Sequence, residues 1–349
     1  MKWIEIDLGA IRHNAAFVRS KMSAGVRMMA VVKADGYGHG AIPVAKAAIA
    51  AGADCLGALT LEEGLILRRG GLKCPIVLLA PPLPSQAAAV VRGKLEPTVD
   101  SELLLSALRK RAGRWRVPVH LDVDYGLGRW GVSPKEAQAF IPRIAKDRRL
   151  RLAGLSTHLG YVSGKNAIEA EQKLRHFKHL CDAARKAAPG VLCHAATSSI
   201  LLDFPHWQFD MVRIGNLLYG IDPTRSVAAS LKSPWKFQAR IIALNKVAAG
   251  EAVGYANEYV APKAMTVATV PVGYADGLTM EPVERLIGFG ARANYWGMLE
   301  GKKAPFVGRC AISHVMLDVS AVRGVKEGDA ITLPIRRTAA SARLPREYS

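Results

Sequence analysis

Short apolar runs recur along the first two-thirds of the chain, and stretches with helical spacing separate most of them. Each run has the length of a strand that is buried on both faces, as in a parallel sheet covered by helices. Eight such strands alternating with helices predict an α/β fold of the (β/α)8 TIM-like barrel type, whereas six would favour a doubly wound sheet. The expected strands cover residues 28–32, 55–59, 75–80, 95–99, 117–123, 152–156, 191–195 and 211–214, and the clearest helices cover 42–51, 62–69 and 169–188.

After about residue 232 the pattern changes to short runs punctuated by glycine and proline, with no convincing long helix between them. This sequence pattern is typical of a mostly-β domain. We therefore expect a barrel domain at residues 1–230 and a C-terminal β domain at 231–349, with a first strand at 3–6 that could belong to either. The expected strands of the second domain cover residues 239–247, 266–272, 305–307, 314–319 and 330–333.

The composition is that of a globular protein without a membrane span. Half of the 349 residues are apolar and 22% are charged, which excludes a mainly disordered chain. No run of 18 residues is both apolar and free of charge, and Glu5 and Asp7 interrupt the N-terminus where a signal peptide needs its apolar core. Five scattered cysteines without a CxxC motif predict no disulfide framework and no metal site, and they fit a cytoplasmic protein.

The charge balance is unusual, because 48 basic residues against 29 acidic ones give a net charge of +19. Two basic clusters, at residues 109–116 and 146–151, could mark a nucleic-acid or anionic surface. No nucleic-acid-binding motif accompanies either cluster. We therefore interpret them as solvated helix ends and expect no nucleic-acid partner and no membrane partner.

Polar side chains follow five of the eight predicted barrel strands, and in this fold such positions meet at one end of the barrel. An amine that directly follows a buried strand is desolvated, which lowers its pKa and makes it a nucleophile for carbonyl groups. The loops after the last two strands often bind phosphate. A nucleophilic lysine beside a phosphate site suggests pyridoxal 5'-phosphate (PLP) as cofactor. The residues are Lys33 after the first strand, Arg129 after the fifth, His158 after the sixth, Thr197 and Ser198 after the seventh, and Arg213, Gly215 and Asn216 at the eighth.

Each of these residues also has a purely structural interpretation. His158 could be a hydrogen-bonded core histidine, Ser198 a helix N-cap, and Arg213 an ion-pair partner, so the argument rests on their convergence. Gly126, Gly128 and Gly131 spell GxGxxG after a predicted strand. No Rossmann half surrounds this motif, and no convincing acidic residue follows about 20 positions later, so we do not expect a dinucleotide site.

Several long segments, which occur across nearly the whole chain, read WIEIDLGAIRHN from Trp3, AVVKADGYGHG, LDVDYGLGRWGV, STHL, FDMVRIGNLLYGI, VGYANEY, VPVGYADG and LPREY. Together these segments resemble the alanine racemase family. The resemblance implies a PLP-dependent enzyme that interconverts L-alanine and D-alanine and supplies D-alanine for peptidoglycan. It also implies a homodimer in which each subunit completes the active site of its partner.

The resemblance further implies a role for each matching residue. Lys33 corresponds to the lysine that binds PLP and acts as one catalytic base, and Tyr274 to the second base, which comes from the partner subunit. Arg213 corresponds to the arginine that faces the pyridine nitrogen, His158 to its hydrogen-bonded neighbour, and Arg129 to the arginine near the cofactor hydroxyl and the substrate carboxylate. The implied phosphate contacts are Tyr37, Ser198, Gly215 and Asn216.

Racemisation explains why these residue types are needed. One proton leaves one face of Cα and another arrives at the opposite face, so two acid/base groups are required. A tyrosine has an ordinary pKa of about 10 and needs nearby positive charge to act near neutrality, for which we consider His158 and Arg213. An arginine does not release its proton, so Arg213 is expected to keep the pyridine nitrogen unprotonated.

Three departures from the family pattern bear on substrate choice and cofactor binding. Asp122 stands where the family often has a carbamylated lysine, and we expect it to pair directly with Arg129. Ile312 and Ser313 replace a Met-Asp pair near the substrate, so Ile312 is our candidate substrate contact. The C-terminal segment is short, and Ala342 falls where a phosphate-contacting tyrosine is expected. A broad-specificity amino-acid racemase and a non-catalytic PLP-binding protein therefore stay open as alternatives, although Tyr274 argues against the second.

Overall fold

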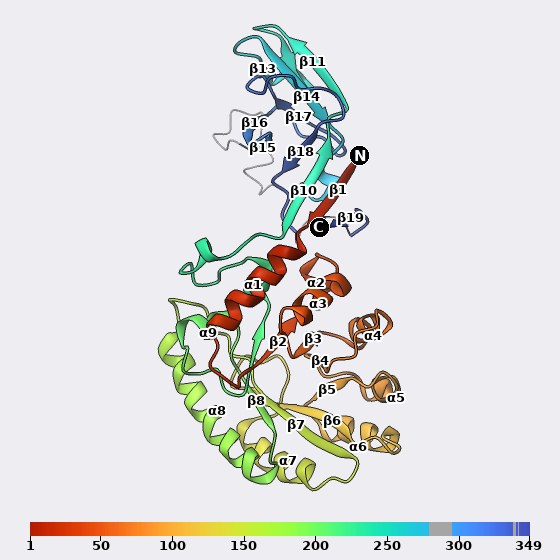
Figure 1. Ribbon diagram of the computed structural model, residues 1–349, viewed down its shortest axis with the longest axis vertical. Helices are drawn as coiled ribbons and strands as arrows, with labels where there is room; N and C mark the ends of the chain where they lie inside the picture. Colours follow the sequence, from red (N-terminus) through yellow and green to blue (C-terminus); the bar gives the residue numbers. More distant parts are fainter. Residues whose placement is uncertain (279–294, 338–339, 341) are drawn as a thin grey trace. The chain divides into compact units, whose positions relative to one another are not determined.

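A computed structural model gives the fold of residues 1–278, 295–337, 340 and 342–349 (Figure 1). The chain divides into two units. One consists of Leu8–Ser233, and the other combines Met1–Asp7 with Pro234–Ser349. We describe each unit by itself.

The first unit holds eight parallel strands in the order β8-β7-β6-β5-β4-β3-β2-β9. Strand β2 pairs with both β3 and β9, so the sheet curls into a barrel that is closed except between β8 and β9, where single backbone bonds such as Arg213 N to Ala196 O take the place of a ladder. The predicted α/β barrel and all eight of its predicted strands are confirmed. The strands are β2 (Arg27–Val31), β3 (Cys55–Ala58), β4 (Ile76–Leu78), β5 (Glu96–Val99), β6 (Val117–Asp122), β7 (Leu150–Ser156), β8 (Leu192–His194) and β9 (Met211–Ile214).

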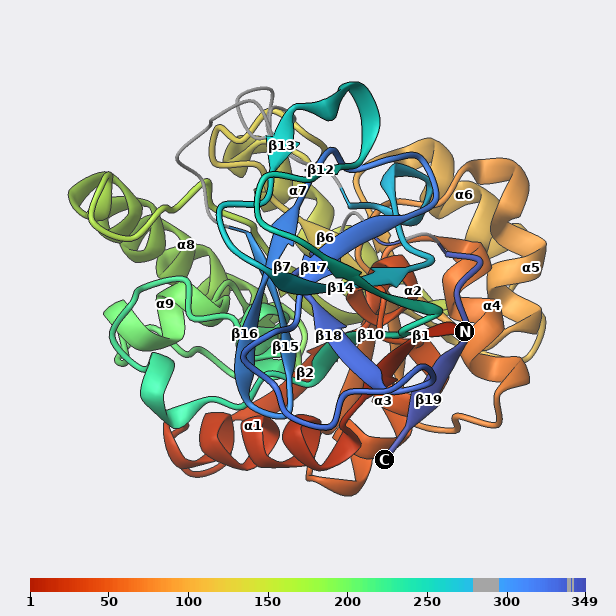
Figure 2. The same cartoon turned by 90° about the horizontal axis from the view of Figure 1, so that it is seen from above.

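Helices connect these strands, and the sequence marks where several of them begin. The side chains of Thr60, Ser101 and Ser133 each accept a hydrogen bond from a backbone N–H of the first turn that follows. Helices α4, α5 and α6 lie next to one another on one side of the barrel, and α8 covers the opposite side (Figures 1 and 2). The helices are α1 (Leu8–Ser20), α2 (Lys33–Tyr37), α3 (Ala41–Ala50), α4 (Leu61–Arg69), α5 (Ala87–Arg92), α6 (Glu102–Arg111), α7 (Pro134–Ala145), α8 (Ala167–Ala187) and α9 (Ser198–Asp203).

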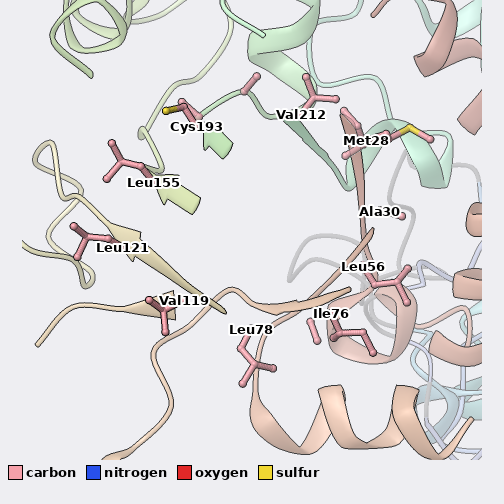
Figure 3. Packing of buried hydrophobic residues seen from close by; sticks show 14 of the residues in the cluster. Met28, Ala30, Leu56, Ile76, Leu78, Val119, Leu121, Leu155, Cys193 and Val212 are labelled. Atoms are coloured by element: carbon pink, nitrogen blue, oxygen red, sulfur yellow. The ribbon is translucent and has the colours of Figure 1, made fainter. Parts of the chain in front are cut away.

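Alternate residues of the barrel strands face two different environments. In β2, Met28 and Ala30 belong to the large core cluster that also contains the buried faces of the helices (Figure 3). Met29 and Val31 belong instead to a small separate cluster with residues of β3, β4 and β9, inside the barrel. Both clusters are buried, which is why the strands read as continuous apolar runs.

The described residues of the second unit form a nine-stranded sheet in the order β11-β14-β17-β16-β15-β18-β10-β1-β19. The mostly-β character expected for this part of the chain is confirmed. Strand β1 pairs with β10 and β19, so the first strand, which the sequence left open, lies in this unit. The strands are β1 (Lys2–Ile6), β10 (Trp235–Arg240), β11 (Ala243–Val247), β12 (Ala252–Val253), β13 (Tyr259–Val260), β14 (Met265–Val270), β15 (Trp296–Leu299), β16 (Lys302–Val307), β17 (Val315–Asp318), β18 (Ala330–Leu333) and β19 (Arg346–Tyr348).

The sequence pattern missed strands β12, β13, β15 and β19, and it merged the end of β10 with β11 into one run. Trp296 and Met298 of β15 are exposed while their neighbours are buried, and β19 is a three-residue edge strand. Such short, half-exposed strands carry little apolar signal. Among the described residues, no helix is long and apolar enough to cross a membrane.

Candidate active site

A cavity of about 310 Å³ lies within the barrel unit, at the carboxyl ends of its strands. Its size is at the lower end of the range for small-molecule sites. All eight barrel residues that the family resemblance assigned to catalysis or cofactor binding line it, and so does Thr197, which was singled out by its place after the seventh strand. They are Lys33, Tyr37, Arg129, His158, Ser198, Arg213, Gly215 and Asn216, and Asp122, Trp130, Ser156 and His194 lie beside them.

Lys33 begins an unusual turn directly after β2. The residues from Ala34 to Tyr37 all have left-handed backbone angles, with φ of 51° at Ala34, 52° at Asp35, 60° at Gly36 and 54° at Tyr37. Left-handed angles are costly for residues other than glycine, so neighbouring contacts must hold this turn in place. Burial and the positive charge of Arg129 lower the pKa of Lys33, although Glu63 opposes the shift. A lowered pKa favours the free amine, which is the nucleophilic form.

Glu63 is a contact that holds the Lys33 turn, and sequence analysis missed it. Its Oε1 accepts a hydrogen bond from Ala34 N at 2.7 Å, and its Oε2 accepts one from Leu59 N at 2.6 Å. One carboxylate on α4 thus joins the end of β3 to the first left-handed residue. The only sequence signal was the position of Glu63 three residues after the helix cap Thr60, a position that is equally common in ordinary capped helices.

Replacing Glu63 by glutamine is expected to loosen the turn. Glutamine keeps one oxygen acceptor but sets an NH2 group against the second backbone N–H, so a donor faces a donor in place of one of the two hydrogen bonds. Because solvent reaches both hydrogen bonds, the expected loss of stability is about 1 kcal/mol, together with slower attachment of PLP to Lys33. Thermal unfolding and the absorbance of the PLP-bound protein measure these effects.

Glu62 provides the matched control, since it precedes Glu63 on the same helix and is exposed to solvent. Its side chain bonds only the amide of Gln86 among the described residues. Glu62→Gln should leave both measurements unchanged. Equal effects of the two substitutions would show that Glu63 has no special role in the turn.

Arg213 lies on the last barrel strand and is surrounded by acceptors. Its Nη1 donates to His194 Nδ1 at 2.9 Å and to His194 O at 2.6 Å, and its Nη2 donates to Thr157 O at 2.8 Å and to His158 Nδ1 at 3.4 Å. Its Nε has no hydrogen-bond partner among the residues that the structure describes, and the side chain lines the cavity. Burial lowers the pKa of Arg213 to about 10, so the group remains positively charged near neutrality.

A line of hydrogen bonds runs from Arg213 into the barrel, and sequence analysis missed it. His194 Nε2 lies 3.0 Å from His120 Nδ1, and His120 Nε2 lies 3.0 Å from Glu96 Oε2. Because arginine can only donate, His194 Nδ1 must accept; its Nε2 then carries the proton and donates to His120, which in turn donates to Glu96. Burial opposes ionisation of Glu96, but the hydrogen bond from His120 holds its pKa below the usual value. The chain of hydrogen bonds therefore ends on the carboxylate of Glu96, and it fixes one tautomer for each imidazole ring, with the proton on Nε2.

His158 is uncharged, which corrects one sequence-based expectation. Burial, together with the charges of Arg213 and Arg129, lowers the pKa of His158 to about 3. It therefore cannot supply positive charge that would acidify a tyrosine near pH 7. Since Nδ1 of His158 accepts from Arg213, the neutral ring carries its proton on Nε2.

Tyr37, Ser198, Gly215 and Asn216 form another part of the cavity wall. The ring of Tyr37 stacks on Tyr219 with centroids 4.6 Å apart, and Tyr219 is held by a hydrogen bond to Val31 O. A Cβ atom at Gly215 would stand 2.5 Å from the Tyr37 hydroxyl oxygen, so any larger residue there would displace the phenol. Ser198 begins α9 and accepts a hydrogen bond from Leu217 N. The hydroxyl groups of Tyr37 and Ser198 thus lie beside the backbone at Gly215 and Asn216. Hydroxyl and backbone N–H groups can donate hydrogen bonds to an anion such as a phosphate.

Asp122 and Arg129 do not form the direct ion pair that we expected within the described chain. Asp122 Oδ1 instead accepts a hydrogen bond from Ser156 Oγ at 2.5 Å, and the Arg129 guanidinium carbon lies 3.7 Å from the centre of the Trp130 ring. Burial raises the pKa of Asp122 to about 6, even though Ser156, Arg213 and Arg129 favour its charged form. The negative charge of Asp122 thus acts on Arg129 at longer range.

The glycines of the GxGxxG motif shape the loop that carries Arg129. The carboxylate of Asp124 accepts hydrogen bonds from the backbone N–H groups of residues 126, 127 and 128. Gly131 has a φ of +108°, and a Cβ atom there would stand 2.9 Å from Asp124 N. The loop therefore needs these glycines for its own turns, and the nearest helix, α7, begins only at Pro134.

Tyr274 and Ile312 lie together in the β unit. Tyr274 N donates to Ala311 O, Ala275 N donates to Ile312 O, and the Tyr274 hydroxyl donates to Cys310 O at 2.7 Å. Both side chains are exposed, Tyr274 at 42% and Ile312 at 69% of their full accessibility. Ala342, also in this unit, offers no side-chain donor.

Two family models match the chain. The model for "Alanine racemase, N-terminal domain" matches residues 6–223, and the model for "Alanine racemase, C-terminal domain" matches residues 235–343. A relative named alanine racemase from Halothermothrix orenii is 34% identical over 336 residues, covering 95% of this chain and 86% of the relative. Another, from Desulfovibrio desulfuricans, is 36% identical over 338 residues, with coverage of 95% and 88%.

Solved structures with the same fold carry the same name. The alanine racemase from E. faecalis superposes with a TM-score of 0.86 at 28% identity, covering 100% of this chain and 98% of that chain. An alanine racemase from Bacillus anthracis, solved with bound L-Ala-P, gives a TM-score of 0.83 at 27% identity, with coverage of 100% and 95%.

Proposed function

The chain belongs to the alanine racemase family, and we propose that it interconverts L-alanine and D-alanine with PLP, using Lys33 and Tyr274 as its two bases. It is thus an isomerase. The observation that carries the assignment of residues is the cavity in which the eight motif residues of the barrel meet. No single one of them would suffice, because each also has an ordinary structural interpretation.

The residues around the cavity fit PLP. Lys33 supplies the amine that would bind the PLP aldehyde, and Tyr37, Ser198, Gly215 and Asn216 supply an anion cradle for its phosphate. The Nε–H of Arg213, which has no hydrogen-bond partner in the described chain, would serve the pyridine nitrogen. When bound, PLP withdraws electrons from the Cα–H bond of the attached amino acid.

The surroundings of each base support proton transfer near neutral pH. The lowered pKa of Lys33 leaves its amine able to accept a proton from one face of Cα. Tyr274 would exchange a proton with the opposite face. The fixed charge of Arg213, anchored by His194 and Thr157, would keep the pyridine nitrogen unprotonated and is the remaining candidate for acidifying the tyrosine.

We further propose that the active form is a homodimer, in which the β unit of one subunit brings Tyr274 and Ile312 to the cavity of the other. Tyr274 and Ile312 share one exposed surface of the β unit, as residues of a shared site would. The five free cysteines fit a cytoplasmic enzyme, and the product D-alanine would enter peptidoglycan synthesis.

Chiral analysis tests the function directly. Purified protein loaded with PLP is incubated separately with L-alanine, L-serine and L-lysine, and the enantiomers are separated. We expect D-alanine to form fastest. If the protein binds PLP but does not racemise alanine, the proposal is contradicted. Comparable rates with serine or lysine would favour a broad-specificity racemase. The exposed Ile312 and its neighbour Ser313, which replace the family's Met-Asp pair, are the observation that supports this alternative.

Asp122→Asn is expected to make the protein more stable at pH 7 and less active. The folded pKa of Asp122 is about 6 against an ordinary 3.8, so the folded state binds more protons between these values and stability falls as pH rises through them. The difference between the two pKa values corresponds to a loss of about 3 kcal/mol in folding stability above pH 6, which asparagine avoids because it carries no charge. Unfolding free energies at pH 7 and at pH 4 measure it, and the advantage of the variant should largely disappear at pH 4.

Ser156→Ala serves as the companion variant for this test. It removes the hydrogen bond that favours charged Asp122 and should raise the pKa of Asp122 further. The pH range over which stability falls should therefore shift upward. The activity of Asp122→Asn should fall mainly through a higher KM, because the charge near Arg129 is lost. An unchanged KM together with unchanged stability would contradict both roles of Asp122.

A further inference from the structure

The turn that carries Tyr274 is tied to the N-terminal strand by one lysine. Lys2 Nζ lies 2.6 Å from Asp276 Oδ1 and donates a hydrogen bond to Pro271 O at 3.0 Å. Pro271 precedes Tyr274 by three residues, and Asp276 follows it by two. A single ammonium group therefore holds both sides of the turn.

Asp276 is buried inside the turn, at 5% exposure. Its second oxygen, Oδ2, accepts a hydrogen bond from Gly273 N at 3.1 Å, which closes the short helical turn Tyr274–Asp276. A buried carboxylate needs a charged partner, and in the described chain its ion pair is with Lys2. Removal of the ammonium would leave an unpaired buried charge at the point where the turn closes.

The backbone of Lys2 is itself firmly anchored. Lys2 pairs with Ala239 of β10, and Arg240 N donates a hydrogen bond to Met1 O at 2.8 Å. The turn follows β14, and five strands separate β14 from β1 in the order of the sheet (Figure 1). The Lys2 side chain thus connects two strands that are remote from each other along the ladder.

The opposite side of the turn rests on Ala311 and Ile312, whose carbonyl oxygens accept backbone bonds from Tyr274 N and Ala275 N. The phenol ring of Tyr274 is itself 42% exposed, and its hydroxyl donates a hydrogen bond to Cys310 O at 2.7 Å. Its position therefore depends on that bond and on the two attachments of the turn, one to residues 311–312 and one to Lys2.

We propose that Lys2, acting through Asp276, is a positioning residue for Tyr274. The inference rests on the proposed role of Tyr274 as the second base. Displacement of a reacting group by about 1 Å can cost a large factor in rate, so a loose turn should slow the proton transfer at Tyr274 and leave the transfer at Lys33 unaffected.

Isotope effects distinguish this role from general damage. A racemase has an equilibrium constant of one, so kcat/KM must fall equally in both directions whichever step is slowed. If the step at Tyr274 becomes limiting, the effect of deuterium at Cα rises for the enantiomer whose proton Tyr274 removes. It falls for the other enantiomer, whose proton Lys33 removes. Solvent exchange of the Cα hydrogen in Tyr274→Phe identifies the two enantiomers, because in that variant only the enantiomer whose proton Lys33 removes should exchange.

The experiment compares Lys2→Met, Lys2→Arg and Lys236→Met in the PLP-loaded enzyme. Lys236 is the matched control, because it forms an exposed ion pair with Glu5 across the same strands β1 and β10 but does not touch the turn. Lys2→Met should lower kcat about tenfold with little change in KM and should show the opposed isotope effects. Lys2→Arg should recover most of the rate, and Lys236→Met should behave as wild type.

Hydrogen exchange at residues 271–278 provides a readout that does not depend on activity. Exchange there should quicken in Lys2→Met and not in Lys236→Met. If Lys2→Met does not fold, Lys2→Met/Asp276→Asn replaces it, since it removes the clamp without leaving a buried charge. Unchanged kcat, or equal isotope effects in both directions, would overturn the proposal for Lys2. Equal solvent exchange of the Cα hydrogen from both enantiomers in Tyr274→Phe would instead overturn the role of Tyr274.

Discussion

Lys33→Ala is expected to lose nearly all racemase activity, by about 10⁴-fold or more, because it removes both the covalent attachment of PLP and one of the two bases. Lys33 lies at the cavity, directly after a buried strand, and burial lowers its pKa toward the reactive free amine. Borohydride reduction of the wild-type protein with PLP should fix the cofactor on Lys33. Activity assays and peptide mapping of the reduced protein measure the two effects.

Lys46→Ala is the control for this experiment, since Lys46 is an exposed lysine on the neighbouring helix α3. It should retain wild-type activity and the wild-type label. A label on a lysine other than Lys33, or a substantial residual rate in Lys33→Ala, would show that another amine holds the cofactor.

Mixing inactive Lys33→Ala chains with inactive Tyr274→Phe chains is expected to restore activity. If each active site combines the barrel of one subunit with Tyr274 of the other, half of the sites in a hybrid dimer regain both native residues. Random exchange of subunits then predicts about a quarter of wild-type activity. The measurement is racemisation before and after exchange, which is followed by mass differences between labelled chains.

A mixture of Lys33→Ala with Lys33→Ala/Tyr274→Phe controls for effects of mixing, because none of its dimers contains a complete site. It should stay inactive. No recovery in the first mixture, despite demonstrated subunit exchange, would mean that Tyr274 acts within its own chain or does not act at all.

The barrel could be predicted from sequence because its strands are buried on both faces. Met28 and Ala30 face the helices while Met29 and Val31 face the barrel interior, so the run has no polar interruption and is easily recognised. The half-exposed strand β15 lacks that signal and was missed. The carboxyl ends of the strands in a barrel also meet at one end of the fold. For this reason the sequence could predict that Lys33, His158 and Arg213 share one site.

The support of these residues was decided by tertiary contacts between distant segments. Glu63 reaches the Lys33 turn from another helix, and His120 joins His194 to Glu96 across separate strands. Lys2 reaches Asp276 across a sheet. A hydrogen bond depends on distance and angle between atoms far apart in the chain, and local residue patterns carry no such information.

Charge states were decided in the same way. The sequence suggested that His158 could be positive and that Asp122 would pair directly with Arg129, but burial beside Arg213 leaves His158 neutral and Asp122 bonds Ser156 instead. The sequence by itself determined the barrel, the β unit and the residues that line the cavity. Only the tertiary structure decided their protonation and their supports, because desolvation and Coulomb interactions depend on the three-dimensional surroundings of each group.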